Sequence, residues 1–183
     1  MVNEVTPALF EQYGDAASLA DAPQRRVEKL VRRTGFFTMK ARALRECAKG
    51  VVERFGGDVP EDFDALVSLR GVGRKTASVV LGTAFGQPAV FVDTHVKRLA
   101  YRLGLTSNED PDRIQQDLKA LLPKEEWTAF CHRLIHHGRS ICKARAPRCE
   151  ICPLLDVCPR VGVEDPLPRA RPTRKAIGVN STT

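Results

Sequence analysis

Long apolar runs are missing from this sequence of 183 residues, and no stretch approaches the roughly 18 apolar residues that a membrane-spanning helix requires. The first residues, MVNEVTPALFEQYG, lack both a basic segment and an apolar run, so we expect no secretory signal and a cytoplasmic location. Alternation of apolar and polar residues, the mark of a half-buried strand, is almost absent. Aromatic residues are scarce at 6%, yet 43% of the residues are hydrophobic and 28% are charged, which excludes wholesale disorder.

Apolar residues recur at helical spacing along most of the chain. The pattern predicts helices over residues 27–31, 41–55, 63–69, 77–84, 94–103, 111–121 and 127–138. Asp110 and Pro111 suit a helix N-terminus, and Gly104 suits the position just beyond a C-terminus. The apolar run at 89–92 is the one candidate strand, but it is short and has no partner. We therefore predict an all-α protein.

Positive charge exceeds negative charge, with 29 Lys and Arg against 22 Asp and Glu and a net charge of +7. This excess favours a polyanionic partner such as nucleic acid, although a solvated basic surface is the alternative. Residues 159–183 are rich in proline and basic residues and poor in apolar ones. We expect them to form a disordered basic tail.

Four of the six cysteines lie close together in the pattern C-x6-C-x2-C-x5-C, whereas Cys47 and Cys131 stand apart. The four are Cys142, Cys149, Cys152 and Cys158. In a chain without an export signal, such a group predicts a metal site rather than a disulfide framework. Thiolates suit zinc or iron–sulfur clusters. The single short C-x2-C fits the usual zinc pattern poorly, and spacing alone leaves the metal open.

Residues 69–77, LRGVGRKTA, stand between two predicted helices. Two glycines around one apolar residue allow a tight turn whose amides, at the start of the next helix, can bind a phosphate. An ordinary corner between helices is the alternative. A P-loop requires Gly where Arg74 stands, and a dinucleotide-binding fingerprint requires Gly where Thr76 stands, so neither motif is present.

Two charged residues next to these helix starts are candidates for catalysis. Lys75 is expected in the first turn of its helix, where the helix dipole and Arg74 favour the neutral, nucleophilic amine, although a surface lysine is the alternative. Asp93 is expected as the N-cap of helix 94–103, an arrangement that leaves one carboxylate oxygen able to face a cleft. The histidines are assigned no chemistry.

The order of three motifs, LRGVGRKTA at 69–77, VDTH at 92–95 and the four cysteines, resembles the endonuclease III family of helix–hairpin–helix DNA glycosylases and lyases. The likeness runs from about residue 1 to residue 158. It implies a 4Fe–4S cluster on the four cysteines and a monomer that binds double-stranded DNA at damaged bases or abasic sites, in the nucleoid. The implied site residues are Gly71, Val72, Gly73 and Arg74 against DNA, Lys75 as nucleophile and Asp93 as catalytic carboxylate.

The resemblance also implies an architecture and a reaction. A six-helix domain would cover residues 1–87, with the hairpin at about 66–86. A cluster domain would cover 88–158, and the active site would lie in the cleft between them. An oxidised pyrimidine would be flipped out of the duplex, Lys75 would displace it from C1′, and β-elimination from the resulting Schiff base would nick the strand. Asp93 would promote deprotonation of the lysine and stabilise positive charge on the sugar.

The sequence departs from the family at several points. Arg70 replaces the proline usual in the hairpin, and the family carries a further N-terminal stretch before the point that corresponds to Met1. Phe36 falls where the family places an apolar wedge, with a core phenylalanine as the alternative. Two other functions stay open: a non-catalytic or impaired DNA-binding iron–sulfur protein, because of the missing stretch, and an adenine-type mispair glycosylase. The latter lacks the lysine found at Lys75.

Overall fold

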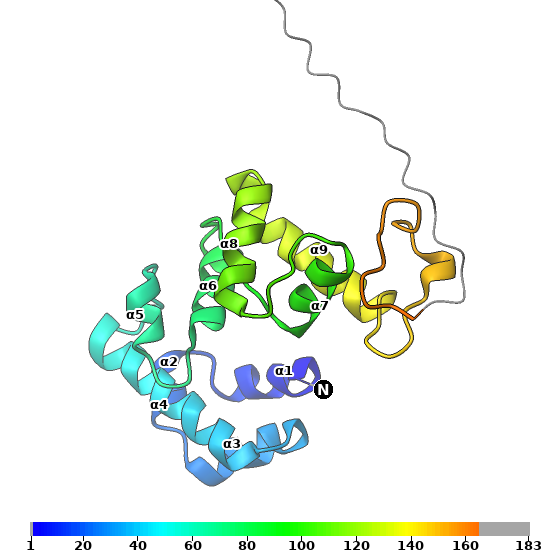
Figure 1. Cartoon of the computed structure of the whole chain (residues 1–183). Coiled ribbons are helices and arrows are strands. Elements are labelled where there is room, and N and C mark those ends of the chain that lie inside the picture. The colour runs from blue at the N-terminus through cyan, green and yellow to red at the C-terminus, as the bar shows by residue number, and fades with distance from the viewer. Residues whose placement is uncertain (1, 165–183) are drawn as a thin grey trace, which may run out of the picture. The chain divides into compact units, whose positions relative to one another are not determined.

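The computed structural model describes residues 2–164, and within that range it contains helices and no strands (Figure 1). The all-α prediction is confirmed. The chain divides into two compact units, Met1–Ala89 and Val90–Thr183. No helix in the described range has the length and apolar character needed to cross a membrane.

The first unit consists of helices joined by short turns. They are α1 (Val2–Gln12), α2 (Ala16–Ala20), α3 (Gln24–Val31), the 3-10 turn η1 (Arg32–Thr34), α4 (Phe37–Phe55), α5 (Phe63–Val67) and α6 (Arg74–Ala84). The sequence pattern did not predict α1, which contains Pro7 and buries only Val5 and Leu9. Helix α2 was also missed, because its five residues are fixed by a capping box between Asp15 and Ser18 rather than by an apolar stripe.

Two apolar clusters hold the first unit together. One gathers residues of α1, α3, the start of α4 and the turns after α1 and before α3: Leu9, Tyr13, Ala22, Val27, Val31 and Ala41. The other packs α5 and α6 against the second half of α4: Val51, Leu66, Leu69, Ala77 and Leu81. The second cluster therefore fixes the turn between α5 and α6, which is the predicted hairpin.

The second unit is built on three α-helices and two 3-10 turns in its described residues. They are α7 (Thr94–Arg102), α8 (Pro111–Leu121), η2 (Lys124–Glu126), α9 (Trp127–Ser140) and η3 (Cys149–Ile151). Its fully buried side chains include Phe91, Leu99, Ile114 and Leu118. The candidate strand at 89–92 has no regular structure. Val90 and Phe91 of this segment are buried. The apolar run therefore reflects burial of the segment between α6 and α7 and not a strand.

Residues 159–164, which their composition assigned to the tail, pack against the second unit. Arg160 is buried in a left-handed conformation with φ 54°, and Val161 donates its amide hydrogen to the Arg102 carbonyl at 3.1 Å. Gly162 lies against the ring of Tyr101. Packing therefore continues beyond Cys158 to the end of the described chain. The rest of the predicted tail, residues 165–183, lies outside the described residues.

Candidate functional site

The turn between α5 and α6 is a tight hairpin held against α4. The amide of Val72 donates to the Leu69 carbonyl at 3.1 Å, and Gly71 has a φ of 80°, which favours glycine. A Cβ atom on Gly71 would lie 3.2 Å from the Cβ of Ala43 on α4. Gly73 has an extended conformation and is the N-cap of α6. Both glycines are exposed, so the backbone of the hairpin is open to a partner.

Helix α6 begins at the exposed end of this hairpin. Gly73 has no side chain that could cap the first amides of the helix, and Lys75 and Thr76 are exposed in its first turn. The amides and the positive end of the helix dipole together suit an anion such as a DNA phosphate. Lys75 thus stands where the sequence placed it, in the first turn after the hairpin.

The arginines on either side of the hairpin are held by neighbouring groups. Arg70, which replaces the family's proline, pairs with Glu46 of α4 at 3.2 Å. A hydrogen bond from Arg42 is the main cause that lowers the pKa of Glu46, and the charge of Arg70 adds to it. The guanidinium of Arg74 lies over the ring of Phe63, 5.1 Å from its centroid. The exchange of proline for Arg70 thus adds an ion pair between the hairpin and α4.

Phe36 projects into solvent at the start of α4. The residue is 83% exposed, and its φ of 48° is left-handed, directly after Gly35 at φ 67°. A bulky residue seldom adopts this conformation, and such strain is concentrated at functional sites. The alternative of a core phenylalanine is wrong. An exposed aromatic ring at this turn is compatible with the predicted wedge.

Asp93 is the N-cap of α7 in the second unit, as predicted. Its Oδ1 accepts hydrogen bonds from the amides of His95 and Val96, both at 2.8 Å. The residue is half-buried, and one oxygen takes both amides. Lys75 belongs to the first unit, so the pairing of these two residues across a cleft stays a prediction.

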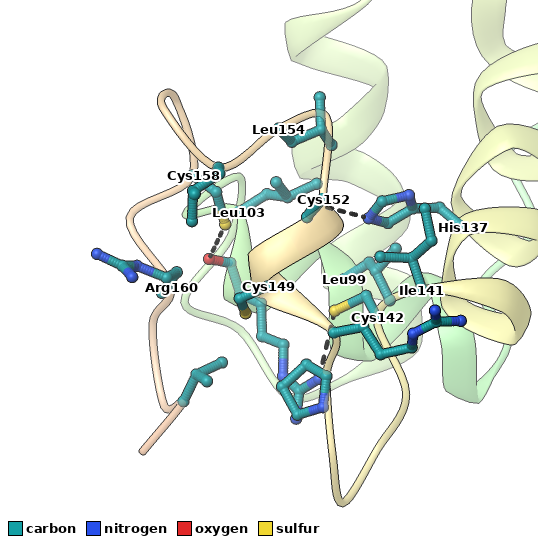
Figure 2. Close-up of a pocket in the computed structure, with 15 residues that line it drawn as sticks. Leu99, Leu103, His137, Ile141, Cys142, Cys149, Cys152, Leu154, Cys158 and Arg160 are labelled. Atoms are coloured by element: carbon teal, nitrogen blue, oxygen red, sulfur yellow. Dashed lines mark hydrogen bonds between the residues drawn. The ribbon is translucent and has the colours of Figure 1, made fainter. Parts of the chain in front are cut away.

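The four clustered cysteines line one pocket in the second unit, as Figure 2 shows. The cavity itself measures about 30 Å³, and the space between its lining residues that no atom fills, open solvent included, is about 440 Å³. None of the four forms a disulfide. Cys142 follows α9, while Cys149 begins η3 and Cys152 follows it. The apolar walls include Leu99, Leu103, Ile141 and Leu154.

The donor set of this pocket fits an iron–sulfur cluster. Thiolates are soft ligands that suit iron, and all four cysteines line this one pocket. A 4Fe–4S cluster bonds each cysteine to a different iron, which suits thiols spread around a pocket. Burial raises the pKa of the Cys158 thiol, and the nearby Cys152 and Cys142 add to the rise, so bound iron would favour the ionised form of this one sulfur.

Side chains that the sequence reasoning missed surround the cysteines. Arg98 on α7 donates to the carbonyls of Gly138 and Cys142, both at 3.0 Å, and Arg102, one turn further, also reaches Cys142. His137 Nε2 lies 3.4 Å from Cys152 Sγ. Burial is the main cause that lowers the pKa of Arg98, followed by the charge of Arg102. One signal in the sequence pointed to these side chains. Arg98 and Arg102 lie four positions apart on one helix, where two positive charges repel each other unless anions or carbonyl oxygens bind them.

Comparison with protein-family models gives two matches. Residues 1–124 match the model described as the HhH-GPD superfamily base excision DNA repair protein. Residues 142–158 match the iron–sulfur binding domain of endonuclease III, and this segment contains all four clustered cysteines.

Individual proteins give the same result. The chain is 50% identical to endonuclease III of Synechocystis over 159 residues, which cover 86% of this chain and 73% of the relative. It is 43% identical to endonuclease III of Bacillus subtilis, again over 159 residues that cover 86% of this chain and 73% of the relative. Among solved structures it matches a trapped endonuclease III–DNA covalent intermediate with a TM-score of 0.82 and 41% identity, covering 87% of this chain and 75% of the other. A thermostable thymine-DNA glycosylase matches over the same shares with a TM-score of 0.78 and 27% identity. The chain therefore belongs to the endonuclease III family within the HhH-GPD superfamily, and it is a base excision repair DNA glycosylase with a 4Fe–4S cluster.

Proposed function

We propose that the chain is bifunctional: it removes oxidised pyrimidines from double-stranded DNA and then nicks the strand as an abasic-site lyase. The observation that carries this proposal is the exposed position of Lys75 in the first turn of α6, directly after the hairpin. A hairpin that binds phosphate brings the lysine amine beside the adjoining sugar. The proposed enzyme acts as a monomer, at the nucleoid.

DNA binding rests on the backbone of the hairpin and on two side chains. The amides around Gly71, Val72 and Gly73 receive phosphate oxygens, helped by the positive end of α6 and by the charge of Arg74. Phe36 enters the base stack where the damaged base leaves it, because an exposed ring on a strained turn can take the place of a base.

The chemistry runs through the lysine. The Nζ of Lys75 attacks C1′ of the flipped nucleotide, the C1′–N bond breaks, and its electron pair and a proton go to the departing base. The resulting amine adduct opens to a Schiff base. Loss of a C2′ proton then expels the 3′ phosphate, and water releases the lysine. Asp93, whose Oδ1 accepts hydrogen bonds from two α7 amides, takes the proton from the lysine and stabilises the positive sugar.

The ligands of the cluster are proposed to be Cys142, Cys149, Cys152 and Cys158. Support comes from the pocket that all four line and from the match of residues 142–158 to an iron–sulfur binding domain. When bound, the cluster would cross-link the long loop after α9, whose described residues contain only one short 3-10 turn. The reacting groups at the sugar remain Lys75 and Asp93.

A duplex that carries one oxidised pyrimidine tests this function. The wild-type protein should release the base and nick the strand. Lys75→Gln should lose nicking, whereas Lys49→Gln, which removes the same charge from an exposed lysine paired with Glu53, should keep it. Asp93→Asn should slow base release by about 10²- to 10⁴-fold while it still binds DNA. Base release without nicking by the wild type would favour a glycosylase without lyase activity, and binding without either reaction would favour a non-catalytic protein.

A further inference from the structure

Arg102, the last residue of α7, contacts three successive residues at the start of the cysteine loop. Its Nη1 donates to Cys142 Sγ at 3.3 Å and to the Lys143 carbonyl at 2.8 Å. Its Nη2 donates to the Ala144 carbonyl at 2.8 Å. The planar guanidinium thus serves three acceptors at once, which a lysine ammonium on a flexible chain cannot do in the same geometry.

The backbone of the same residue contacts the other end of the loop. The Arg102 carbonyl accepts the amide hydrogen of Val161 at 3.1 Å and the thiol of Cys158 at 3.6 Å. A cysteine that ligates iron is a thiolate and cannot donate, so the bond from Cys158 belongs to the free thiol. The bonds from Val161 and from the guanidinium are compatible with both forms. Arg102 therefore lies between the first and the last cysteine of the loop.

The loop itself has little regular structure to fix its shape. Beyond α9, the described chain forms only η3, of three residues. Ordering such a segment costs backbone entropy, so contacts from a rigid helix help to fix its shape. In the described residues, no carboxylate forms an ion pair with Arg102, and its guanidinium contacts the sulfur of Cys142.

We propose that Arg102 is a positioning residue for the iron–sulfur cluster, which holds the ends of the ligand loop and tunes the cluster electronically. The proposal rests on the ligand set given above. A charged donor on a ligand sulfur stabilises the more negative, reduced cluster, so Arg102 raises the reduction potential. Its clamp on residues 142–144 also slows opening of the loop and the loss of iron.

Substitutions of Arg102 in the purified holoprotein separate these two effects. Arg102→Gln should release iron to a chelator about 10- to 100-fold faster than the wild type, as is usual for groups that support metal ligands. Its reduction potential, measured by film voltammetry, should shift to a more negative value. Arg102→Lys keeps the charge but not the fork, so its potential should shift less while iron release is still accelerated.

The matched control is Arg133→Gln, which removes one positive charge from an arginine of the same unit paired with Glu126 at 2.8 Å. It should match the wild type in both measurements. An Arg102→Gln protein that folds but retains no iron would also support the role of Arg102 in holding residues 142–144. The reduction potential of the cluster would then be measured on Arg102→Lys.

Iron and sulfide analysis of the wild type keeps the two proposals distinguishable. A wild-type protein without the cluster would overturn the ligand set, and the role of Arg102 with it. A cluster-loaded wild type whose potential and iron-release rate are unchanged by Arg102→Gln would overturn the role of Arg102 alone.

Discussion

The two glycines of the hairpin should respond differently to replacement by alanine. Gly71 has a left-handed backbone, and an added Cβ would lie 3.2 Å from the Cβ of Ala43. The left-handed conformation costs an alanine about 1–2 kcal/mol, and the close contact adds to that cost. Each kcal/mol lowers the Tm of a unit of this size by roughly 4–8 °C. Gly71→Ala should therefore clearly destabilise the first unit.

Gly73 is the matched control for conformation. Its φ of −91° is open to any residue, and an added Cβ would meet no atom within 4 Å. Alanine makes the unfolded chain less flexible, which stabilises the folded protein by about 0.4–1 kcal/mol. This stabilisation offsets the cost of replacing glycine by alanine at the N-cap of a helix. Gly73→Ala should change the free energy of unfolding by no more than about 0.5 kcal/mol, so its Tm should stay close to that of the wild type. If the backbone of the hairpin approaches phosphate closely, the same change should weaken binding to duplex DNA.

Thermal unfolding and DNA titration of the two variants, at one salt concentration, measure both effects. The expected pattern is a Gly71→Ala protein that unfolds at lower temperature and a Gly73→Ala protein that folds normally but binds DNA less tightly. A Gly73→Ala protein with wild-type affinity would refute close approach of the hairpin to DNA. A Gly71→Ala protein with wild-type Tm would refute the conformational reasoning.

Three further predictions concern the cysteines and the charge. Cys149→Ser or Cys152→Ser should lose iron and sulfide together, whereas Cys47→Ser, outside the pocket, should keep both; iron retained by either of the first two variants would contradict the ligand set. Burial raises the pKa of Cys131 to about 11, so only about one molecule in a thousand carries that thiolate at pH 8. Cys131 should resist alkylation in the native protein and react in denaturant, and rapid native labelling would contradict its burial. Deletion of residues 165–183, which include four basic residues, should lower the salt slope of log K for DNA binding by up to about 3.6 and leave lesion preference unchanged. An unchanged slope would show that these charges do not meet phosphate.

Helices with explicit end signals could be predicted from the sequence. Asp110 accepts the Arg113 amide at 3.0 Å as the N-cap of α8, and Gly104 has the left-handed φ of 70° expected just after α7. These signals act between residues that are close in sequence, so the local pattern contains them. Helix α1 has no such signal, and its place depends on packing of Val5 and Leu9, which a local pattern cannot reveal.

The candidate site divides in the same way. The spacing of the four cysteines predicted that they act together, and the structure places them around one pocket. The exposure of Phe36 could not be predicted, because an apolar residue beside a glycine is equally compatible with a core. Arg102 could not be found either, since its partners Cys142 and Lys143 lie some forty positions away and no local pattern connects them.

Borohydride trapping tests the central claim, that Lys75 forms a Schiff base with damaged DNA. Reduction of the Schiff base leaves a stable amine, so the cluster-loaded wild type should become covalently linked to a duplex with an oxidised pyrimidine or an abasic site. Peptide mapping should place the link on Lys75, and Lys75→Gln should give none while Lys49→Gln gives the wild-type yield. A link on another lysine, or no link from cluster-loaded wild-type protein, would contradict the proposed mechanism.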